Sequence, residues 1–545
     1  MAQAGPAADW VSQLADDVIA ETERRSPGEA VVVASGLSPS GPIHLGNLRE
    51  VMVPHLVADE IRRRGRDCVH ILSWDDFDRL RKVPAGVDPS WAEHVGKPLS
   101  SVPAPPGSAH ASWAEHFKAP MEAALARLGV EFRGISQTRM YTSGAYTRQV
   151  LLAMRERHRI DAVLAEYRTK QSEDDGVTGA GYYPYKPYCA ACERDLTMVT
   201  GYDDESTALS YACRCGHSET VGLAGHRRGK LVWKVDWPMR WAYEGVVFEP
   251  SGVDHQAPGS SFVVGGRLVS EIFGGQQPIG PMYAFVGISG MAKMSSSRGG
   301  VPTPADALDI MEAPVLRWLY ARRRPQQSFT VAFDAEVHRL YDEWDAVVRK
   351  VEAGSASGPD AVSYSRAVRT AAGELPRTPR PLPYRMLASV ADITTGDAAQ
   401  TLRILRDCDP GRPLASLDEV RPRLDRARVW AATQLPADQR TVLAGEPDAT
   451  ALESLTESER AALDLLLAGL DAHWSLDGLS QLVYAVPKLQ AGVAADALPT
   501  PELKLAQRAF FALVYRLLIG RDTGPRLPTL LLAAGPERIR KLLGG

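Results

Sequence analysis

The sequence predicts an α/β protein in which a Rossmann-type domain is interrupted by a large insertion and followed by an all-helical region. Three observations predict this arrangement. A strand–turn–helix–strand pattern occupies residues 30–74, four cysteines cluster within 189–215, and helical patterns with few strand signals fill the chain beyond about residue 384. A chain of 545 residues is too long for one ordinary core, so we expect two to four domains.

The first elements form a βαβ unit. Residues 30–35 (AVVVAS) are a short apolar, β-branched run, which is typical of a buried parallel strand. The turn-rich GLSPSGP follows, and then the helical pattern HLGNLREVMVPHLVADEIRRRG, which Gly65 closes. A second apolar strand at residues 68–74 completes the unit, and its crossover is expected to be right-handed.

The same domain is expected to resume after an insertion. Residues 81–107 are rich in proline and glycine, and we interpret them as insertion and not as core. The elements predicted after them are helices near 113–128 and 146–167, strands at 231–236 and 245–249, a helix near 260–273 and an apolar run at 282–288. The predicted domain therefore spans residues 30–330, with the insertion at about 82–230 and its cysteine-rich part at 185–220.

Helical segments are expected on both sides of this domain. Residues 1–29 contain an amphipathic helix whose acidic residues do not suit a signal peptide, and no segment approaches the roughly 20 apolar residues of a membrane span. We therefore expect a cytoplasmic protein that binds no membrane. Residues 331–384 are predicted as a connecting helical region with linker-like stretches at 353–365 and 375–384, and residues 385–545 as a helical domain.

The composition excludes several classes of protein. The hydrophobic fraction of 45% and the charged fraction of 23% are those of a globular chain. A net charge of −4 excludes wholesale neutralisation of phosphates and leaves only a local basic face, and we expect no DNA binding. Six cysteines in so long a chain do not indicate a disulfide framework.

The segment PSGPIHLGN, residues 39–47, lies where a turn opens the first long helix and is predicted to bind phosphates. Glycines let the backbone approach a phosphate, and a helix N-terminus offers free N–H groups and the positive end of its dipole. His44 can donate to a phosphate oxygen, Gly46 leaves room for an adenine ring, and Asn47 can donate to phosphate or ribose. The alternative is an ordinary helix start with a surface histidine, which the preceding apolar strand disfavours.

A second segment, GMAKMSSSRGG at residues 290–300, follows the apolar run that ends at Ile288 and precedes a helix beginning near Pro302. This glycine-bounded loop carries Lys293, three hydroxyls and Arg298, which are groups that can close on a pyrophosphate. Alone, such a segment is equally typical of a solvated loop. Because both segments follow strands, together they predict one nucleotide site built from two distant parts of the chain.

The four clustered cysteines have the spacing of a zinc site. Cys189-x2-Cys192 is followed twenty residues later by Cys213-x-Cys215, which predicts a closed, structural Zn²⁺ site of four thiolates. Two alternatives are that His217 replaces one thiolate and that the cysteines are simply buried and reduced. His110 and His116 are assigned to a helix and the loop before it and not to a second metal site.

These segments resemble the class I aminoacyl-tRNA synthetases, whose HIGH and KMSKS signatures match residues 44–47 and 293–297. The longer strings YYPYKPYCAAC and GKLVWKVDWPMRWAYEGVVFEPSGVDHQAPGSS are similar to the class I lysyl-tRNA synthetase family, and the likeness runs from about residue 15 to the end. The sequence departs from the signatures at Asn47, which replaces the second histidine, and at Ser296, which replaces the second lysine. Lys293, with Arg298, must then supply more of the positive charge that contacts the phosphates.

The resemblance implies that the carboxylate of lysine attacks the α-phosphate of ATP, that pyrophosphate leaves with Mg²⁺, and that the adenylate passes its acyl group to the terminal adenosine of tRNA, usually first to the 2′-hydroxyl. Such chemistry needs positioning and charge stabilisation, with no covalent nucleophile. The catalytic residues it implies are His44, Asn47 and Lys293. The ATP-binding residues it implies are Pro39, Ser40, Gly41, His44, Gly46, Asn47, Lys293, Met294, Ser295, Ser296 and Ser297.

For the amino-acid pocket, the resemblance implies Gly36, Ser38, Trp233, His255 and Tyr283. A lysine ammonium needs a carboxylate or an aromatic face, and WKVDWPMRWAYEG offers both, with Asp236 as an uncertain ligand. At least two of its tryptophans are expected to pack in the core instead. The acidic cluster Asp75, Asp76 and Asp78 is not assigned to Mg²⁺.

The expected partners are L-lysine and tRNA, the latter bound through its anticodon by the helical C-terminal domain of a monomeric protein. Candidate tRNA contacts are Trp474, Tyr484 and arginines 403, 406, 412, 421, 423, 426 and 428, although interspersed acids are typical of an ordinary solvated helix face. Open alternatives are specificity for glutamate or arginine, a synthetase-derived ligase acting on a small amine, and an inactive zinc-containing RNA-binding protein. The long helical domain disfavours the small-amine ligase, and His44 with Lys293 disfavours the inactive protein.

Overall fold

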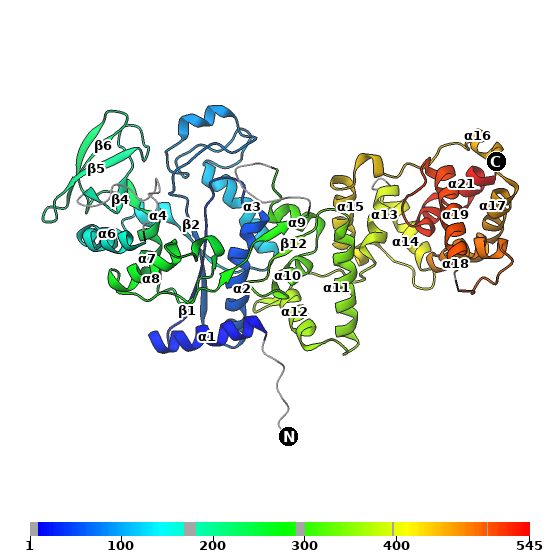
Figure 1. Cartoon of the computed structure of the whole chain (residues 1–545), viewed down its shortest axis with the longest axis horizontal. Coiled ribbons are helices and arrows are strands. Elements are labelled where there is room, and N and C mark those ends of the chain that lie inside the picture. The colour runs from blue at the N-terminus through cyan, green and yellow to red at the C-terminus, as the bar shows by residue number, and fades with distance from the viewer. Residues whose placement is uncertain (1–8, 168–180, 290–299, 395–396, 499, 545) are drawn as a thin grey trace, which may run out of the picture. The chain divides into compact units, whose positions relative to one another are not determined.

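The computed structural model describes residues 9–167, 181–289, 300–394, 397–498 and 500–544 (Figure 1). The chain divides into two compact units. The first comprises Met1–Leu308, Ala313–Val331 and Lys350–Leu375, and the second comprises Asp309–Glu312, Ala332–Arg349 and Pro376–Gly545. Among the described helices, none combines the length and apolar character that crossing a membrane requires.

A parallel sheet forms the centre of the first unit. Its strands β1 (Val31–Leu37), β2 (Cys68–Trp74) and β3 (Arg133–Ser136) pair in that order. Parallel bridges from Val33 to Phe248 and from Phe248 to Ile279 extend the sheet beyond β1. The first two predicted strands are confirmed, whereas the strand predicted at 245–249 is reduced to the single bridge at Phe248.

Two N-terminal helices pack beside this sheet. The turn η1 (Leu45–Asn47) and helix α2 (Leu48–Arg63) connect β1 to β2, and α1 (Trp10–Arg25) packs on α2. Arg366 of α12 (Gly358–Val368) holds both helix regions, because its guanidinium donates to Asp9 and Glu60 at 2.7 Å each. The prediction of a linker over 353–365 is therefore wrong for most of that stretch, which is an ordered helix with a buried ion pair.

The connection between β2 and β3 has a core of its own. It contains η2 (Pro89–His94) and α3 (Trp113–Arg127). Leu99 and Val102 have no exposed surface and pack with Leu80 and Trp113. The interpretation of 81–107 as lying outside the core is therefore wrong for these residues: prolines and glycines shape the loop while its few apolar side chains turn inward.

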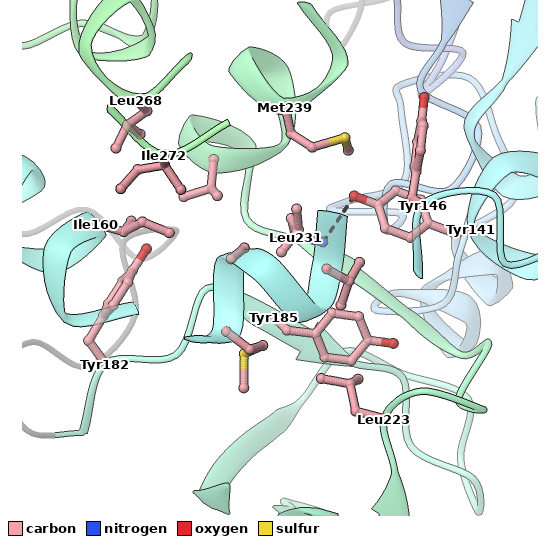
Figure 2. Packing of buried hydrophobic residues seen from close by; sticks show 14 of the residues in the cluster. Tyr141, Tyr146, Ile160, Tyr182, Tyr185, Leu223, Leu231, Met239, Leu268 and Ile272 are labelled. Atoms are coloured by element: carbon pink, nitrogen blue, oxygen red, sulfur yellow. Dashed lines mark hydrogen bonds between the residues drawn. The ribbon is translucent and has the colours of Figure 1, made fainter. Parts of the chain in front are cut away.

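A tyrosine-rich core supports the inserted region (Figure 2). In Figure 2 the backbone N–H of Leu231 donates to Tyr141 Oη at 3.2 Å, beside Tyr146 and Tyr185. The helices here are α4 (Gln137–Thr142), α5 (Thr147–Arg155) and α6 (Arg157–Glu166). The antiparallel strands are β4 (Tyr185–Pro187) with β8 (Gly229–Leu231), and β5 (Thr197–Tyr202) with β6 (Ala208–Cys213) and β7 (Ser218–Gly222).

Helix α7 (Trp233–Glu244) replaces the strand predicted at 231–236. Its tryptophans at 233, 237 and 241 recur every four residues, a spacing that aligns them on one helical face. Gly245, with φ +66°, ends the helix. The prediction is wrong because the four-residue spacing of the tryptophans, which continues beyond the short β-branched and aromatic run, favours a helix.

The other elements of the first unit follow in chain order: β9 (Ser251–Gly252), η5 (Val253–His255), α8 (Ser261–Glu271), β10 (Met282–Tyr283), β11 (Val286–Ile288), α9 (Pro304–Ile310), α10 (Ala313–Ala321), β12 (Phe329–Val331), β13 (Arg369–Thr370) and β14 (Gly373–Glu374). Helix α8 packs on α7, and β11 pairs in parallel with β12.

The second unit is helical. Its long helices are most of α11 (Glu336–Glu352), α13 (Tyr384–Thr394), α14 (Ala398–Cys408), α15 (Arg423–Thr433), α17 (Glu457–Gly469), α18 (Leu476–Gln490) and α19 (Pro501–Ile519), with shorter α16 (Ala449–Glu453), α20 (Leu527–Ala534) and α21 (Pro536–Gly544). The 3-10 turns are η7 (Leu417–Val420), η8 (Ala437–Gln439) and η9 (Asp471–His473). The prediction that residues 385–545 are helical is confirmed for the described part of that range.

Candidate active site and metal centre

The first predicted nucleotide segment lies at the carboxyl end of β1. His44 precedes η1 in extended conformation, and its Nδ1 is buried without a hydrogen-bond partner in the described structure. Burial lowers the pKa of His44, which favours the neutral imidazole. A neutral ring with an unused nitrogen can accept a ligand hydrogen bond or donate one, according to its tautomer.

The second segment, with Lys293, Met294, Ser295, Ser296 and Ser297, lies outside the described residues, and the structure describes the chain on both sides of it. The N–H of Leu45 donates to the carbonyl of Pro302 at 2.8 Å. Strand β11, which leads into the segment, lies against η1. The chain therefore leaves for the second segment and returns from it directly beside the first.

Buried Arg49 strengthens this junction. From the first turn of α2 its guanidinium donates to the carbonyls of Ala284 at 2.9 Å, Arg324 at 2.8 Å and Gln327 at 2.9 Å. Ala284 lies two residues before β11. Arg49 thus joins the helix of the first segment to the strand that leads into the second.

A cavity of about 210 Å³ opens on the sheet face covered by α7. It brings together Gly36, Ser38, Asn47, Trp233 and His255, all of which the sequence singled out. Tyr283 does not line it directly, but its hydroxyl donates to Glu50, which does. The remaining lining residues are Ala34, Leu37, Ile71, Ser73, Asp75, Trp237, Arg240, Trp241, Val246, Glu249 and Ser251.

Aromatic rings form one wall of the cavity. Trp233 stacks on Trp237 with ring centroids 5.1 Å apart, and Trp237 contacts Trp241 at 4.9 Å. His255 lies 5.7 Å from the Trp237 ring. Trp237 and Trp241 are buried, so the expectation that two tryptophans pack in the core holds, although both also line the cavity.

Asp236 is not among the residues that line the cavity. It is fully buried and accepts from Tyr141 Oη at 2.5 Å, while Arg240 and Lys230 supply the positive charge. These cations hold the pKa of Asp236 below its ordinary value although burial acts to raise it. Asp236 therefore organises the cluster behind the cavity, and the possibility that it touches a ligand is not supported.

The four cysteine sulfurs converge at the base of the antiparallel hairpins. They lie within 4.8 Å of one another, with 3.7 Å between Cys189 Sγ and Cys215 Sγ and 3.6 Å between Cys192 Sγ and Cys213 Sγ. Four thiolates about 2.3 Å from a tetrahedral zinc ion would be about 3.8 Å apart. The donor set therefore fits Zn²⁺, and His217, 3.6 Å from Glu219, is not part of the group.

Comparison with known proteins decides the family. Residues 8–372 match the family described as tRNA synthetases class I (K). The chain belongs to this family. It is 66% identical to the lysine–tRNA ligase of Streptomyces coelicolor, over all of this chain and 99% of that protein. It is 32% identical to the lysine–tRNA ligase of Pyrococcus horikoshii, over 98% of this chain and 99% of that one.

Solved structures give a weaker likeness. A glutamate tRNA ligase from Elizabethkingia meningosepticum is 12% identical and superposes with a TM-score of 0.42, covering 95% of this chain and 99% of that one. The predicted fold class is confirmed at the level of a class I synthetase chain with α/β and helical content.

The sequence did not single out three charged residues of the synthetase cavity. Glu50 lies three residues after Asn47, and this spacing places both on the same helical face and could have identified Glu50. Glu249 is an isolated acid in the apolar run GVVFEP, which is unusual unless the carboxylate is used. Arg240 could not be identified from the sequence because its ion-pair partner, Asp75, is 165 residues away along the chain.

In the second unit, the candidate tRNA contacts divide into buried and exposed side chains. Arg423 is buried and donates to Glu312 at 2.8 Å and Asp345 at 2.9 Å, so the expectation that it faces tRNA is wrong. Tyr484 is half exposed and packs edge-on against Phe511 at 5.2 Å.

Proposed function

We propose that this protein is a lysine–tRNA ligase, which activates L-lysine with ATP and transfers it to tRNA(Lys), releasing AMP and pyrophosphate. The observation that carries the proposal is the cavity between β1 and α7, which joins a tryptophan wall to the first nucleotide segment. The family match and the 66% identity to a lysine–tRNA ligase over the full chain support the choice of amino acid.

ATP is proposed to bind across the first and second segments. Pro39, Ser40, Gly41 and Gly46 would present backbone to the phosphates and adenine, and His44 and Asn47 would contribute hydrogen bonds. The bond between Leu45 N and Pro302 O supports placing Lys293, with Met294, Ser295, Ser296 and Ser297, on the other side of the same triphosphate. Mg²⁺ would enter with ATP as its counter-ion.

Activation needs only positioning and charge. The lysine carboxylate oxygen forms a bond to the α-phosphorus, the bond to the bridging oxygen of pyrophosphate breaks, and pyrophosphate carries the electron pair away. Lys293 would stabilise the charge on the departing phosphates, as preorganised donors do where charge develops. Gly36, Ser38, Trp233, His255 and Tyr283, the last through Glu50, would hold the amino acid in line.

The other regions are proposed to serve tRNA binding and stability. We assign residues 30–330 to a Rossmann-type catalytic domain with the insertion at about 82–230, and residues 385–545 to anticodon binding. The cysteine quartet would hold a structural zinc ion, whose four thiolates leave no open coordination position. Half-exposed Tyr484 suits stacking with an unpaired base.

Amino-acid-dependent pyrophosphate exchange, measured across the amino acids with and without tRNA, tests the proposal. We expect exchange with lysine alone and transfer to tRNA(Lys). Exchange with glutamate or arginine would instead indicate a synthetase of other specificity, adenylate transfer to a small amine would indicate a ligase, and failure to bind ATP would indicate an inactive RNA-binding protein.

A further inference from the structure

Carboxylates lie at both ends of the amino-acid cavity. Of its three acids, Asp75 is paired with Arg240 at 2.7 Å. The donors that contact the other two are neutral: Tyr283 Oη and the backbone N–H of Gly36 donate to Glu50, and Trp241 Nε1 donates to Glu249 at 2.6 Å. Within the described part of the chain, the cavity therefore holds two carboxylates that have hydrogen bonds but no ion pair.

The strand register gives the depth of each carboxylate. Gly36 pairs with Ser73 near the carboxyl end of the sheet, and Ala34 pairs with Ile71 two residues deeper. All four line the cavity because alternate residues of a strand share a face. The N–H of Ala34 donates to the carbonyl of Phe248 at 2.8 Å, which places Glu249, the next residue, at the deeper level.

Glu50 lies at the opposite end. It is one helical turn beyond Asn47, beside the first nucleotide segment, where the reacting carboxylate of the amino acid must lie. Two strand residues span about 6.6 Å. An extended lysine side chain spans about 6 Å from Cα to Nζ over its four-carbon stem. The rise between the two strand levels is therefore comparable with the length of a lysine side chain.

The deep end selects for a cation on an apolar stem. Ala34, Ile71, Val246 and Trp241 line the same cavity as Glu249, which is itself 5% exposed. An unpaired carboxylate in such surroundings is costly, and a ligand ammonium relieves the cost. Burial raises the pKa of Glu249 to about 7, in agreement with a group that lacks its cation.

The geometry points to Glu249 as the specificity-determining residue that binds the side-chain ammonium of the substrate, with Glu50 facing the α-ammonium. This inference rests on the proposed function and adds the charge balance: lysine brings two ammonium groups to two unpaired carboxylates. Glutamate would place its side-chain carboxylate against that of Glu249, and the resulting repulsion would exclude it.

Glu249→Gln tests the assignment because the amide keeps an oxygen acceptor for Trp241 while removing the charge. Pyrophosphate exchange is measured with L-lysine and with 6-hydroxynorleucine, in which a hydroxyl replaces the ammonium. We expect the KM for lysine to rise about 10- to 150-fold, the scale for a charge-assisted hydrogen bond, with little change for 6-hydroxynorleucine or ATP. Glu271→Gln, at the exposed end of α8, is the matched control and leaves all three unchanged.

A second variant covers the case in which the amide disturbs folding. Glu249→Asp keeps the charge but retracts it by one methylene, so the ratio of kcat/KM for homolysine over lysine should rise at least tenfold. An unchanged ratio, or equal losses for lysine and 6-hydroxynorleucine in Glu249→Gln, would overturn the inference. A wild-type protein that does not exchange with lysine would instead overturn the proposed function.

Discussion

Replacing Arg49 by lysine should lower the rate of pyrophosphate exchange by more than the loss of folding stability explains. Arg49 is 2% exposed and donates to three carbonyls on two chain segments. A lysine ammonium on a shorter stem keeps the charge but cannot span all three acceptors, and we expect it to retain one. Losing two hydrogen bonds from a charged donor, at about 1.5–3 kcal/mol each, costs about 3–6 kcal/mol.

This cost predicts two observables. For a unit of roughly 350 residues the entropy of unfolding makes 1 kcal/mol equivalent to about 1.4 °C, so Tm should fall by about 4–8 °C. Because Ala284 leads into β11 and the second nucleotide segment, losing that one bond in the transition state would lower kcat for pyrophosphate exchange about 10- to 150-fold. The KM for lysine should stay within threefold, since other residues line that cavity.

Arg317→Lys is the matched control. Arg317 is fully buried in the same unit and donates to the carbonyls of Leu128 at 2.7 Å and Arg366 at 3.0 Å. It also contacts His55 Nε2 on α2 at 2.9 Å, but none of these three partners lies on β11 or next to it, as Ala284 does. It should lower Tm similarly while exchange, assayed well below Tm, keeps its rate. If both variants lose stability equally and both retain full kcat, the role assigned to Arg49 is refuted.

Three further predictions concern the loop lysine, the metal and the pH. Lys293→Ala should raise the activation free energy of adenylate formation by about 2–4 kcal/mol. Lys82→Ala, at an exposed lysine, should leave it unchanged. Near-normal lysine-dependent pyrophosphate exchange in Lys293→Ala would contradict the role assigned to Lys293. The purified protein should contain one zinc per chain by atomic absorption, lost in Cys213→Ser but kept in Cys408→Ala, and full zinc content in Cys213→Ser would contradict the four-thiolate site. Because Glu249, whose pKa is about 7, must be ionised to bind an ammonium, the KM for lysine should rise about tenfold from pH 8 to pH 6, and Glu249→Gln should abolish that rise. Arg240 and Asp75 also act on Glu249, so a rise that persists in the variant would assign the titration to another group.

Local pattern was sufficient wherever the chemistry of a segment decides its structure. The run AVVVAS became β1, and the turn and helix after it became η1 and α2 with Gly65 in the left-handed region at φ +76°. The cysteine spacing was enough to predict a convergent quartet because two short knuckles constrain where four sulfurs lie. The segment after β11, with Lys293, stays a prediction because it lies outside the described residues.

Local pattern failed where packing decides. The run at 231–236 satisfies strand propensity, but three tryptophans four residues apart gain more by covering the sheet as one face of α7. The stretch 353–365 has linker composition, yet Arg366, just beyond it, is fixed by Asp9 and Glu60. Arg423 lies in an arginine-rich stretch that suggests phosphate contacts, yet it is buried and forms ion pairs with Glu312 and Asp345.

The amino-acid sequence by itself determined which chemical groups the chain carries: two candidate phosphate-binding segments, an aromatic strip and four clustered thiols. The tertiary structure alone decided which carboxylates are neutralised and which are left for a ligand. Asp75 pairs with Arg240 across 165 residues, while Glu50 receives neutral donors, the hydroxyl of Tyr283 from 233 residues away and the backbone N–H of Gly36. Charge pairing depends on distances of a few ångströms between side chains, and such distances are set by the folded backbone and not by separation along the chain.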